Sequence, residues 1–107
     1  MEFRMIYITT KNKEEARTIG QELVKNRLAA CVNIIETMSS IYWWQGQIQD
    51  DQEAILIAKT TEEKAPALID KVISLHSYEV PCVLALPILS GNQEFLSWIE
   101  KETQSTQ

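Results

Sequence analysis

Two strand-like segments of unusual length, residues 30–44 and residues 47–60, constrain the fold of this chain more than any other feature. Gln45 and Gly46 stand between them and are typical of a tight turn, so the two segments are predicted to form one β-hairpin. Fifteen strand residues at about 3.4 Å each extend roughly 50 Å, whereas a domain of this size has a radius of gyration of only ~13 Å. The hairpin therefore either bends sharply near residues 37–40 or projects beyond its own domain.

The distal half of the hairpin combines large aromatic side chains with a polar returning strand. Its tip carries Tyr42, Trp43 and Trp44, and monomeric proteins seldom expose such a patch. Because no Arg or Lys is interleaved with these residues, packing between subunits is favoured over an aromatic cage or a base-stacking platform. The acidic segment that follows, residues 50–53, is expected to form a solvated edge that deters misassembly rather than a site for a hard cation.

Five further elements are predicted on either side of the hairpin. Residues 3–10 form an interior strand, and Asn12 with Glu15 begins a helix that ends near Asn26. A second helix, with polar caps from residues 60–63 and Pro66 in its first turn, ends near His76. The remaining elements are an edge strand over residues 80–89 and a short helix that begins after Asn92 and frays from about Lys101.

The order of these elements predicts an α+β fold. A single domain over residues 1–107 is expected, with a ferredoxin-like βαββαβ sandwich, an extended β-hairpin and a short C-terminal helix. In that topology the second and fourth strands occupy opposite edges of the sheet. Cys31 and Cys82 would then lie too far apart to form a disulfide within the chain.

Composition excludes several classes of function. Ten Lys and Arg residues against fifteen Asp and Glu residues give a net charge of −5, which argues against binding to nucleic acid. The longest apolar run, residues 80–89, is too short to span a membrane. No basic and apolar leader precedes the first strand, so a cytoplasmic protein with reduced thiols is expected. No nucleophile–base pair is visible beside the single histidine, so no enzyme is predicted.

Five motifs together resemble the CutA divalent-cation tolerance proteins. They are AACVN at 29–33, SSIYWWQGQI at 39–48, KTTEEK at 59–64, HSYEVPCVLALPI at 76–88 and FLSWI at 95–99. The resemblance covers nearly the whole chain and implies the ferredoxin-like fold. It also implies a tight homotrimer whose long strands pair across subunits, and a link with tolerance to copper and other divalent cations. No reaction is firmly attributed to such proteins.

Two departures from the family pattern concern the metal ligands that the resemblance implies. Some members carry a cysteine late in the first strand and a His–His pair after the second helix. The matching positions here are Thr9, Leu75 and His76, so only His76 is retained. The position of Cys82 is commonly Glu in the family, and a soft sulfur in its place favours Cu(I) or zinc over magnesium or calcium.

The candidate metal ligands are therefore His76, Glu79 and Cys82, three ligand types within seven residues. Copper or another divalent cation is the ligand expected there, with copies from another subunit as further ligands. The alternative structural interpretation is that His76 caps the C-terminus of the second helix. The alternative function is a trimeric regulatory module that binds a small anion or metabolite in clefts between subunits and contacts a protein partner.

Overall fold

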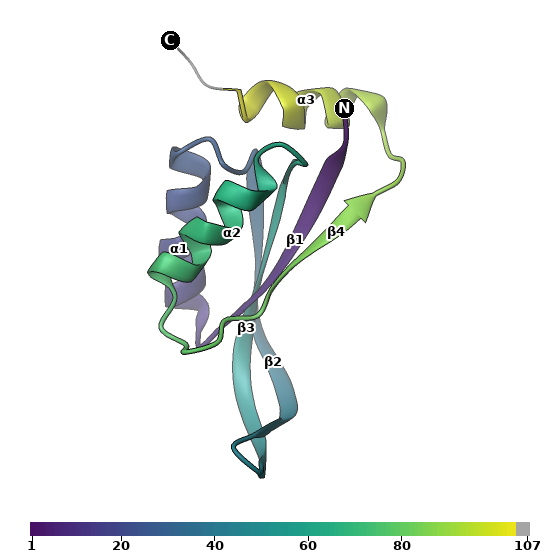
Figure 1. Cartoon of the computed structure of the whole chain (residues 1–107). Helices are drawn as coiled ribbons and strands as arrows, with labels where there is room; N and C mark the ends of the chain where they lie inside the picture. The colour runs from purple at the N-terminus through teal and green to yellow at the C-terminus, as the bar shows by residue number, and fades with distance from the viewer. Residues whose placement is uncertain (105–107) are drawn as a thin grey trace.

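Four strands form one antiparallel sheet in the computed structural model, which describes residues 1–104 (Figure 1). The strand order is β2-β3-β1-β4, with β2 and β4 at the two edges as predicted. The strands are β1 (Phe3–Thr10), β2 (Cys31–Trp44), β3 (Gln47–Thr61) and β4 (Val83–Ile88). The helices are α1 (Lys13–Lys25), α2 (Ala65–Leu75) and α3 (Gln93–Glu102). This arrangement confirms the predicted ferredoxin-like α+β fold with its extended hairpin and C-terminal helix.

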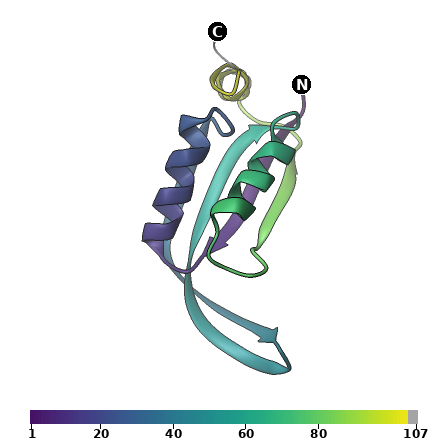
Figure 2. The same ribbon diagram turned by 60° about the vertical axis from the view of Figure 1, so that its left-hand side comes forward.

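The hydrophobic core lies between the sheet and two helices that pack side by side on one of its faces (Figure 2). Alternate residues of the strands point to this face, and residues three or four apart in the helices meet them. The core comprises, among others, Ile6, Ile8 and Leu56 from the sheet, Ile19 and Leu23 from α1, and Leu68 and Val72 from α2. The helices therefore cover one face of the sheet and leave the central part of the other face without a covering layer.

The caps at the N-termini of α1 and α2 only partly match the predicted ones. The Asn12 side chain accepts a hydrogen bond from the Glu15 N–H at 2.9 Å, as expected of an N-cap. The Glu15 carboxylate turns back to the N–H of Lys11 at 3.0 Å rather than to that of Asn12. At α2, Thr61 Oγ1 accepts from the Lys64 N–H at 3.3 Å, and Lys64 itself occupies the N-cap position.

Two predicted boundaries near the C-terminus were wrong. The strand β4 begins at Val83 rather than at residue 80, since Pro81 has no N–H for the ladder, and the last pair with β1 joins Ile8 and Val83. The helix α3 does not fray from Lys101 but continues to Glu102, whereas the same prediction for residues 105–107 lies outside the described residues. The Arg27 guanidinium, from the loop after α1, donates to the Glu102 carbonyl at 3.1 Å and to its carboxylate at 2.9 Å. This tertiary contact holds the last turn of α3 against the domain.

The long hairpin is irregular near the predicted bend and also extends beyond the body of the domain. Both alternatives that the sequence left open, a bend and a projecting arm, are therefore observed. Its register shifts between Ile35 and Met38, close to the predicted bend at residues 37–40. Beyond this irregularity the two strands continue as an arm outside the helix-covered body (Figure 1). Gln45 and Gly46 both have positive φ angles, 52° and 78°, which matches the predicted two-residue turn at the tip.

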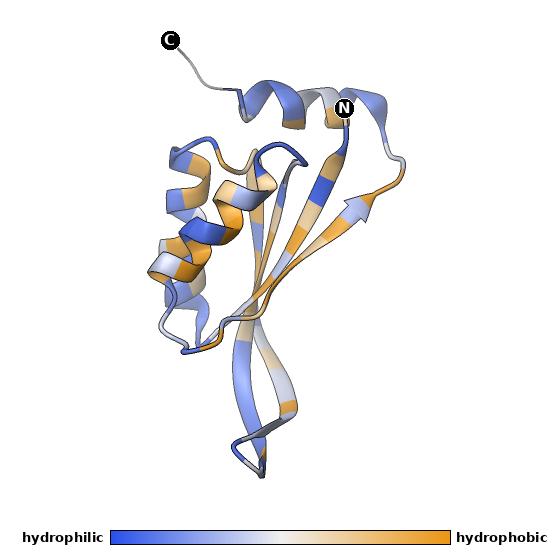
Figure 3. Ribbon diagram, viewed as in Figure 1, coloured by the Kyte–Doolittle hydropathy of each residue, from blue (hydrophilic) through white to orange (hydrophobic). Residues whose placement is uncertain are grey.

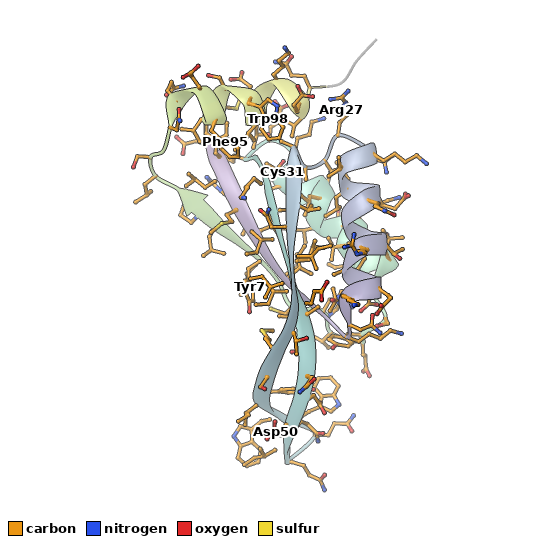
Figure 4. The ribbon with its side chains drawn as sticks, turned by 180° about the vertical axis from the view of Figure 1, so that it is seen from behind. Tyr7, Arg27, Cys31, Asp50, Phe95 and Trp98 are labelled. Atoms are coloured by element: carbon orange, nitrogen blue, oxygen red, sulfur yellow. The ribbon has the colours of Figure 1, made fainter. Side chains whose placement is uncertain are left out.

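The face of the sheet opposite α1 and α2 is rich in apolar residues. Leu84, Ile35 and Leu86 are 57%, 48% and 40% exposed there. Figure 4 views the chain from behind, with Phe95 and Trp98 of α3 at one end, Tyr7 in the middle and Asp50 on the arm. The hydropathy colouring of Figure 3 shows apolar residues along β4 and again on the arm, away from the two-helix layer. The helices described within residues 1–104 are all too short or too polar to span a membrane.

Candidate functional site

A cleft of about 820 Å³ lies where the arm leaves the body of the domain. Three segments that are distant in sequence form its walls: the end of β1, the arm, and the loop between α2 and β4. Its lining residues are Tyr7, Thr9, Met38, Ser39, Ser40, Ile41, Tyr42, Trp44, Glu53, Ser77, Tyr78, Glu79, Val80 and Cys82. All three tyrosines of the chain are among them.

A buried carboxylate belongs to this cleft. Glu53 is only 8% exposed, and it pairs with Met38 directly after the register shift of the hairpin. The Tyr78 hydroxyl, from the α2–β4 loop, donates a hydrogen bond to Glu53 Oε2 at 2.7 Å. Burial raises the pKa of Tyr78, and the hydrogen bond to Glu53 and its negative charge raise this pKa further. Tyr78 therefore remains protonated and donates its hydrogen bond to Glu53.

The predicted solvated edge over residues 50–53 was wrong for Glu53. Asp50 and Asp51 are exposed, but Glu53 lies beneath Tyr78 of the α2–β4 loop. Local polarity suggested solvent exposure because the sequence does not show which loop folds back over a strand. One feature of the sequence could have indicated burial, because Glu53 directly precedes AILIA, the apolar segment over residues 54–58.

A second tyrosine–carboxylate pair lies on the arm itself. The Tyr42 hydroxyl donates to Asp51 Oδ2 at 2.8 Å across the hairpin. This hydrogen bond raises the pKa of Tyr42, with smaller contributions from burial and from the charges of Asp51 and Glu53. At the opposite wall, the Tyr7 hydroxyl lies 3.7 Å from Met38 Sδ, a weak acceptor. The phenol rings thus bring apolar surface and hydroxyl groups to the same cleft.

His76 occupies the C-cap position of α2, but its ring does not cap the helix as the structural interpretation expected, because both ring nitrogens bond to groups outside α2. Nε2 lies 2.7 Å from the Thr9 carbonyl oxygen, and Nδ1 lies 3.1 Å from the Tyr78 N–H. A carbonyl only accepts and a backbone N–H only donates, so this geometry requires a neutral ring with its proton on Nε2. The imidazole therefore connects the α2–β4 loop to the end of β1.

The other two predicted metal ligands, Glu79 and Cys82, line the cleft, whereas His76 is absent from its lining. Across residues 1–104, no three His, Cys, Asp or Glu side chains are grouped closely enough to hold an ion together. A metal site of His76, Glu79 and Cys82 thus stays a prediction, and it needs ligands from outside a single chain. Cys31 and Cys82 are both free thiols, and they lie towards opposite edges of the sheet, as predicted.

Glu15 has a second role that sequence reasoning missed. Besides its bond to Lys11, its carboxylate accepts a hydrogen bond from the Ser77 N–H at 2.9 Å. Burial tends to raise the pKa of Glu15, but the hydrogen bonds from Ser77 and Lys11 outweigh it, and the pKa lies below its ordinary value. Glu15 thereby anchors the start of the α2–β4 loop, and this loop forms one wall of the cleft.

Together, the fold and the site define a small α+β protein with a cleft rich in acceptor groups, an aromatic arm and an uncovered apolar sheet face. The sequence profile described as "CutA1 divalent ion tolerance protein" matches residues 4–102. The chain belongs to this family, as its motifs suggested. The family description is one of ion tolerance and names no reaction.

Individual relatives agree with this assignment. The chain is 48% identical over 99 residues to the divalent-cation tolerance protein CutA of Thermus thermophilus, covering 92% of this chain and 96% of that one. It is 43% identical to human protein CutA over 92% of this chain, but it spans only 55% of the human protein.

Solved structures of relatives share the whole fold. A CutA structure from Archaeoglobus fulgidus has a TM-score of 0.92 at 42% identity, covering 95% of this chain and 99% of that one. A CutA1 structure from Oryza sativa has a TM-score of 0.94 at 40% identity, covering 99% and 97%.

Proposed function

We propose that this protein acts in divalent-cation tolerance as a homotrimer that binds the ions directly, copper among them. The family assignment supports the ion-related role. The homotrimer is supported by one observation: the apolar sheet face and the aromatic arm are exposed to solvent in a single chain. Protection by binding requires no catalytic step, so we infer no enzymatic activity.

The case for self-association rests on exposed apolar surface and on two open sheet edges. Ile41 and Trp43 on the arm are 71% and 70% exposed, and Leu84 on the sheet face is 57% exposed. Burial of such surface stabilises an assembly by about 25 cal/mol per Å². The edges β2 and β4 have no second neighbour within residues 1–104. Pairing between two different edges forms a closed ring where the rotation between copies closes, and in the proposed ring of three no edge is left open.

Glu79 and Cys82 are the residues we propose as metal ligands from one chain, because both line the cleft. A thiolate favours Cu(I) and zinc. His76 joins them only if its ring gives up the bond to Thr9 or to Tyr78. A neighbouring subunit then supplies the remaining ligands. A cytoplasmic location is part of the proposal, supported by the free thiols, although the Archaeoglobus relative is titled periplasmic.

Zn²⁺ titration of the fully reduced protein tests the metal proposal, since zinc does not oxidise thiols. Analytical ultracentrifugation at micromolar concentration is expected to show a trimer. Cys82→Ser is expected to weaken zinc binding at least tenfold, and His76→Ala to weaken it less. Cys31→Ser is the matched control, because Cys31 is also a half-buried free thiol but lies outside the cleft. Equal affinities in both serine variants would contradict the assigned ligands, and a stable monomer would contradict the assembly.

A further inference from the structure

We propose that the cleft at the root of the arm binds a small organic cation, an alkyl ammonium, with the Glu53 carboxylate as its charge partner. This ligand class is separate from the divalent ions of the proposed function and does not depend on them.

Glu53 is a buried carboxyl group with no basic partner among the described residues. It is 8% exposed, and its one hydrogen bond among the described side chains comes from the Tyr78 hydroxyl to Oε2. The ion pairs formed within residues 1–104 involve other carboxylates, those of Glu2, Glu36, Glu62 and Glu102. A carboxylate withdrawn from water is costly unless it is paired and hydrogen-bonded. No basic side chain within residues 1–104 pairs with Glu53, so the carboxyl group is available to a positive group from outside the chain.

The second oxygen of Glu53 is reachable from the cleft. No buried side-chain nitrogen or oxygen within residues 1–104 lacks a hydrogen-bond partner. Oε1 accepts no hydrogen bond from the described residues. It therefore cannot be one of the fully buried atoms, and it must be accessible to solvent. Glu53 lines the cleft, and Oε1 is thus open to a ligand there, while Tyr78 holds Oε2 in place. A donor that enters the cleft finds an acceptor whose orientation is already set.

The rest of the lining selects for a cation with an apolar body. None of the cleft residues is Lys, Arg or His, while Glu53 and Glu79 are both acidic. Aromatic rings attract cations through their π faces, and Tyr7, Tyr42 and Trp44 supply such rings. Hydroxyl groups of Thr9 and the Ser39–Ser40 pair provide further polar contacts. An anionic ligand, the alternative raised from the sequence, would find hydroxyl donors but no basic side chain of this chain, and it would face Glu53 and Glu79.

The cleft is large enough for a small organic molecule. The cleft of about 820 Å³ falls within the usual range for small-molecule sites, roughly 300–1,000 Å³. A divalent cation needs several ligands converging on one point, and residues 1–104 of one chain hold no such group of three. An alkyl ammonium needs only one carboxylate, a few acceptors and an apolar wall, and the cleft supplies all of these.

Isothermal titration calorimetry of the assembled protein with putrescine tests this inference. Two ligand controls are 1,4-butanediol, which has the same length but no charge, and citrate, an anion. Putrescine is expected to bind, and the two controls to bind at least tenfold more weakly. Glu53→Gln keeps the shape and removes the charge, so a loss of at least tenfold in putrescine affinity is expected. Glu63→Gln, at an exposed acid outside the cleft, is expected to bind as the unaltered protein does.

Aromatic variants keep the test decisive if Glu53→Gln fails to fold. Trp44→Leu removes a ring that lines the cleft and should weaken putrescine several-fold, whereas Trp43→Leu at the adjacent residue, outside the lining, should not. Absence of putrescine binding, stronger binding of citrate, or equal affinity in Glu53→Gln would each overturn the inference. A lysine or arginine from a neighbouring copy that fills the cleft would also appear as absence of binding. Zinc binding and trimer formation are measured separately and would be unaffected by that outcome.

Discussion

At the scale of single residues, backbone hydrogen bonds to carboxylates and imidazole hold the loop that borders the cleft. Glu15 reaches Ser77, and His76 reaches Thr9, across 62 and 67 positions of the chain. In each case a polar side chain satisfies a backbone group that has no partner in a helix or strand. The sequence placed both residues at helix ends, and the structure agrees, but Glu15 bonds to the Lys11 N–H instead of that of Asn12, and the His76 ring bonds outside α2. The long-range contacts of the two residues could not be inferred.

Glu15→Gln is predicted to destabilise the protein in a pH-dependent way. The folded-state pKa of Glu15 lies below its ordinary value of 4.5, so its carboxylate stabilises the native state above that pH. This stabilisation is lost as the pH falls through the folded-state pKa. Thermal unfolding should therefore show a lower midpoint for Glu15→Gln at pH 7, with the difference shrinking below about pH 4. Glu14→Gln, in the same helical turn but exposed, is the control. A difference that is constant with pH would contradict the prediction.

At the scale of elements, the arm depends on a turn that the sequence predicted and a register shift that it only suggested. Gln45 and Gly46 both adopt left-handed backbone conformations, as a two-residue hairpin turn of this kind requires. Such a turn has a twist that matches the flanking strands, so the aromatic residues before it stay paired with the polar residues after it. Gly20 has a comparable local importance: a Cβ there would lie 3.0 Å from Val32 Cγ2, so the glycine allows α1 to pack closely on the sheet.

Substitutions in this turn are predicted to change stability in opposite directions. Gly46→Ala should lower the free energy of unfolding by about 1 kcal/mol, because a β-carbon disfavours positive φ. A Cβ at this position meets nothing within 4 Å, so the cost is conformational and not steric. Gln45→Asn should raise stability by a few tenths of a kcal/mol, since Asn tolerates the left-handed region better. Equilibrium denaturation measures both changes, and equal stability of all three proteins would argue against a left-handed turn in solution.

At the scale of the whole molecule, one chain exposes much apolar surface on one side of its sheet and on the arm. Helices cover one face of the sheet, while the other face and the arm present apolar side chains to solvent (Figures 2 and 3). The register places Leu84 opposite Tyr7 on the face that lacks α1 and α2, since their neighbours Ile6 and Ile8 point into the core. A charge at Leu84 would therefore lie within an interface that covers this face.

Leu84→Lys is predicted to dissociate the assembly, since a buried unpaired ammonium is costly. Analytical ultracentrifugation should show a shift to smaller species, and the unfolding midpoint should fall. The unaltered protein should gain stability with concentration, as expected where folding and assembly are linked. Val24→Lys, at an exposed apolar residue of α1 on the helical side, is the matched control and should assemble normally. Equal assembly of both variants would place the interface elsewhere.

Local sequence determined the order of the elements, the hairpin and its turn, the first helix cap and, through the motifs, the family. Each of these depends on residues close together in the chain, where periodicity and turn chemistry act. Tertiary structure alone decided that Glu53 is buried, that Tyr78 bonds to it, and that Arg27 extends α3. These contacts join segments that are distant in sequence, and nothing in a local pattern specifies which loop will cover which strand. The cleft is made of such contacts, and so its chemistry could be inferred only after the chain was seen folded.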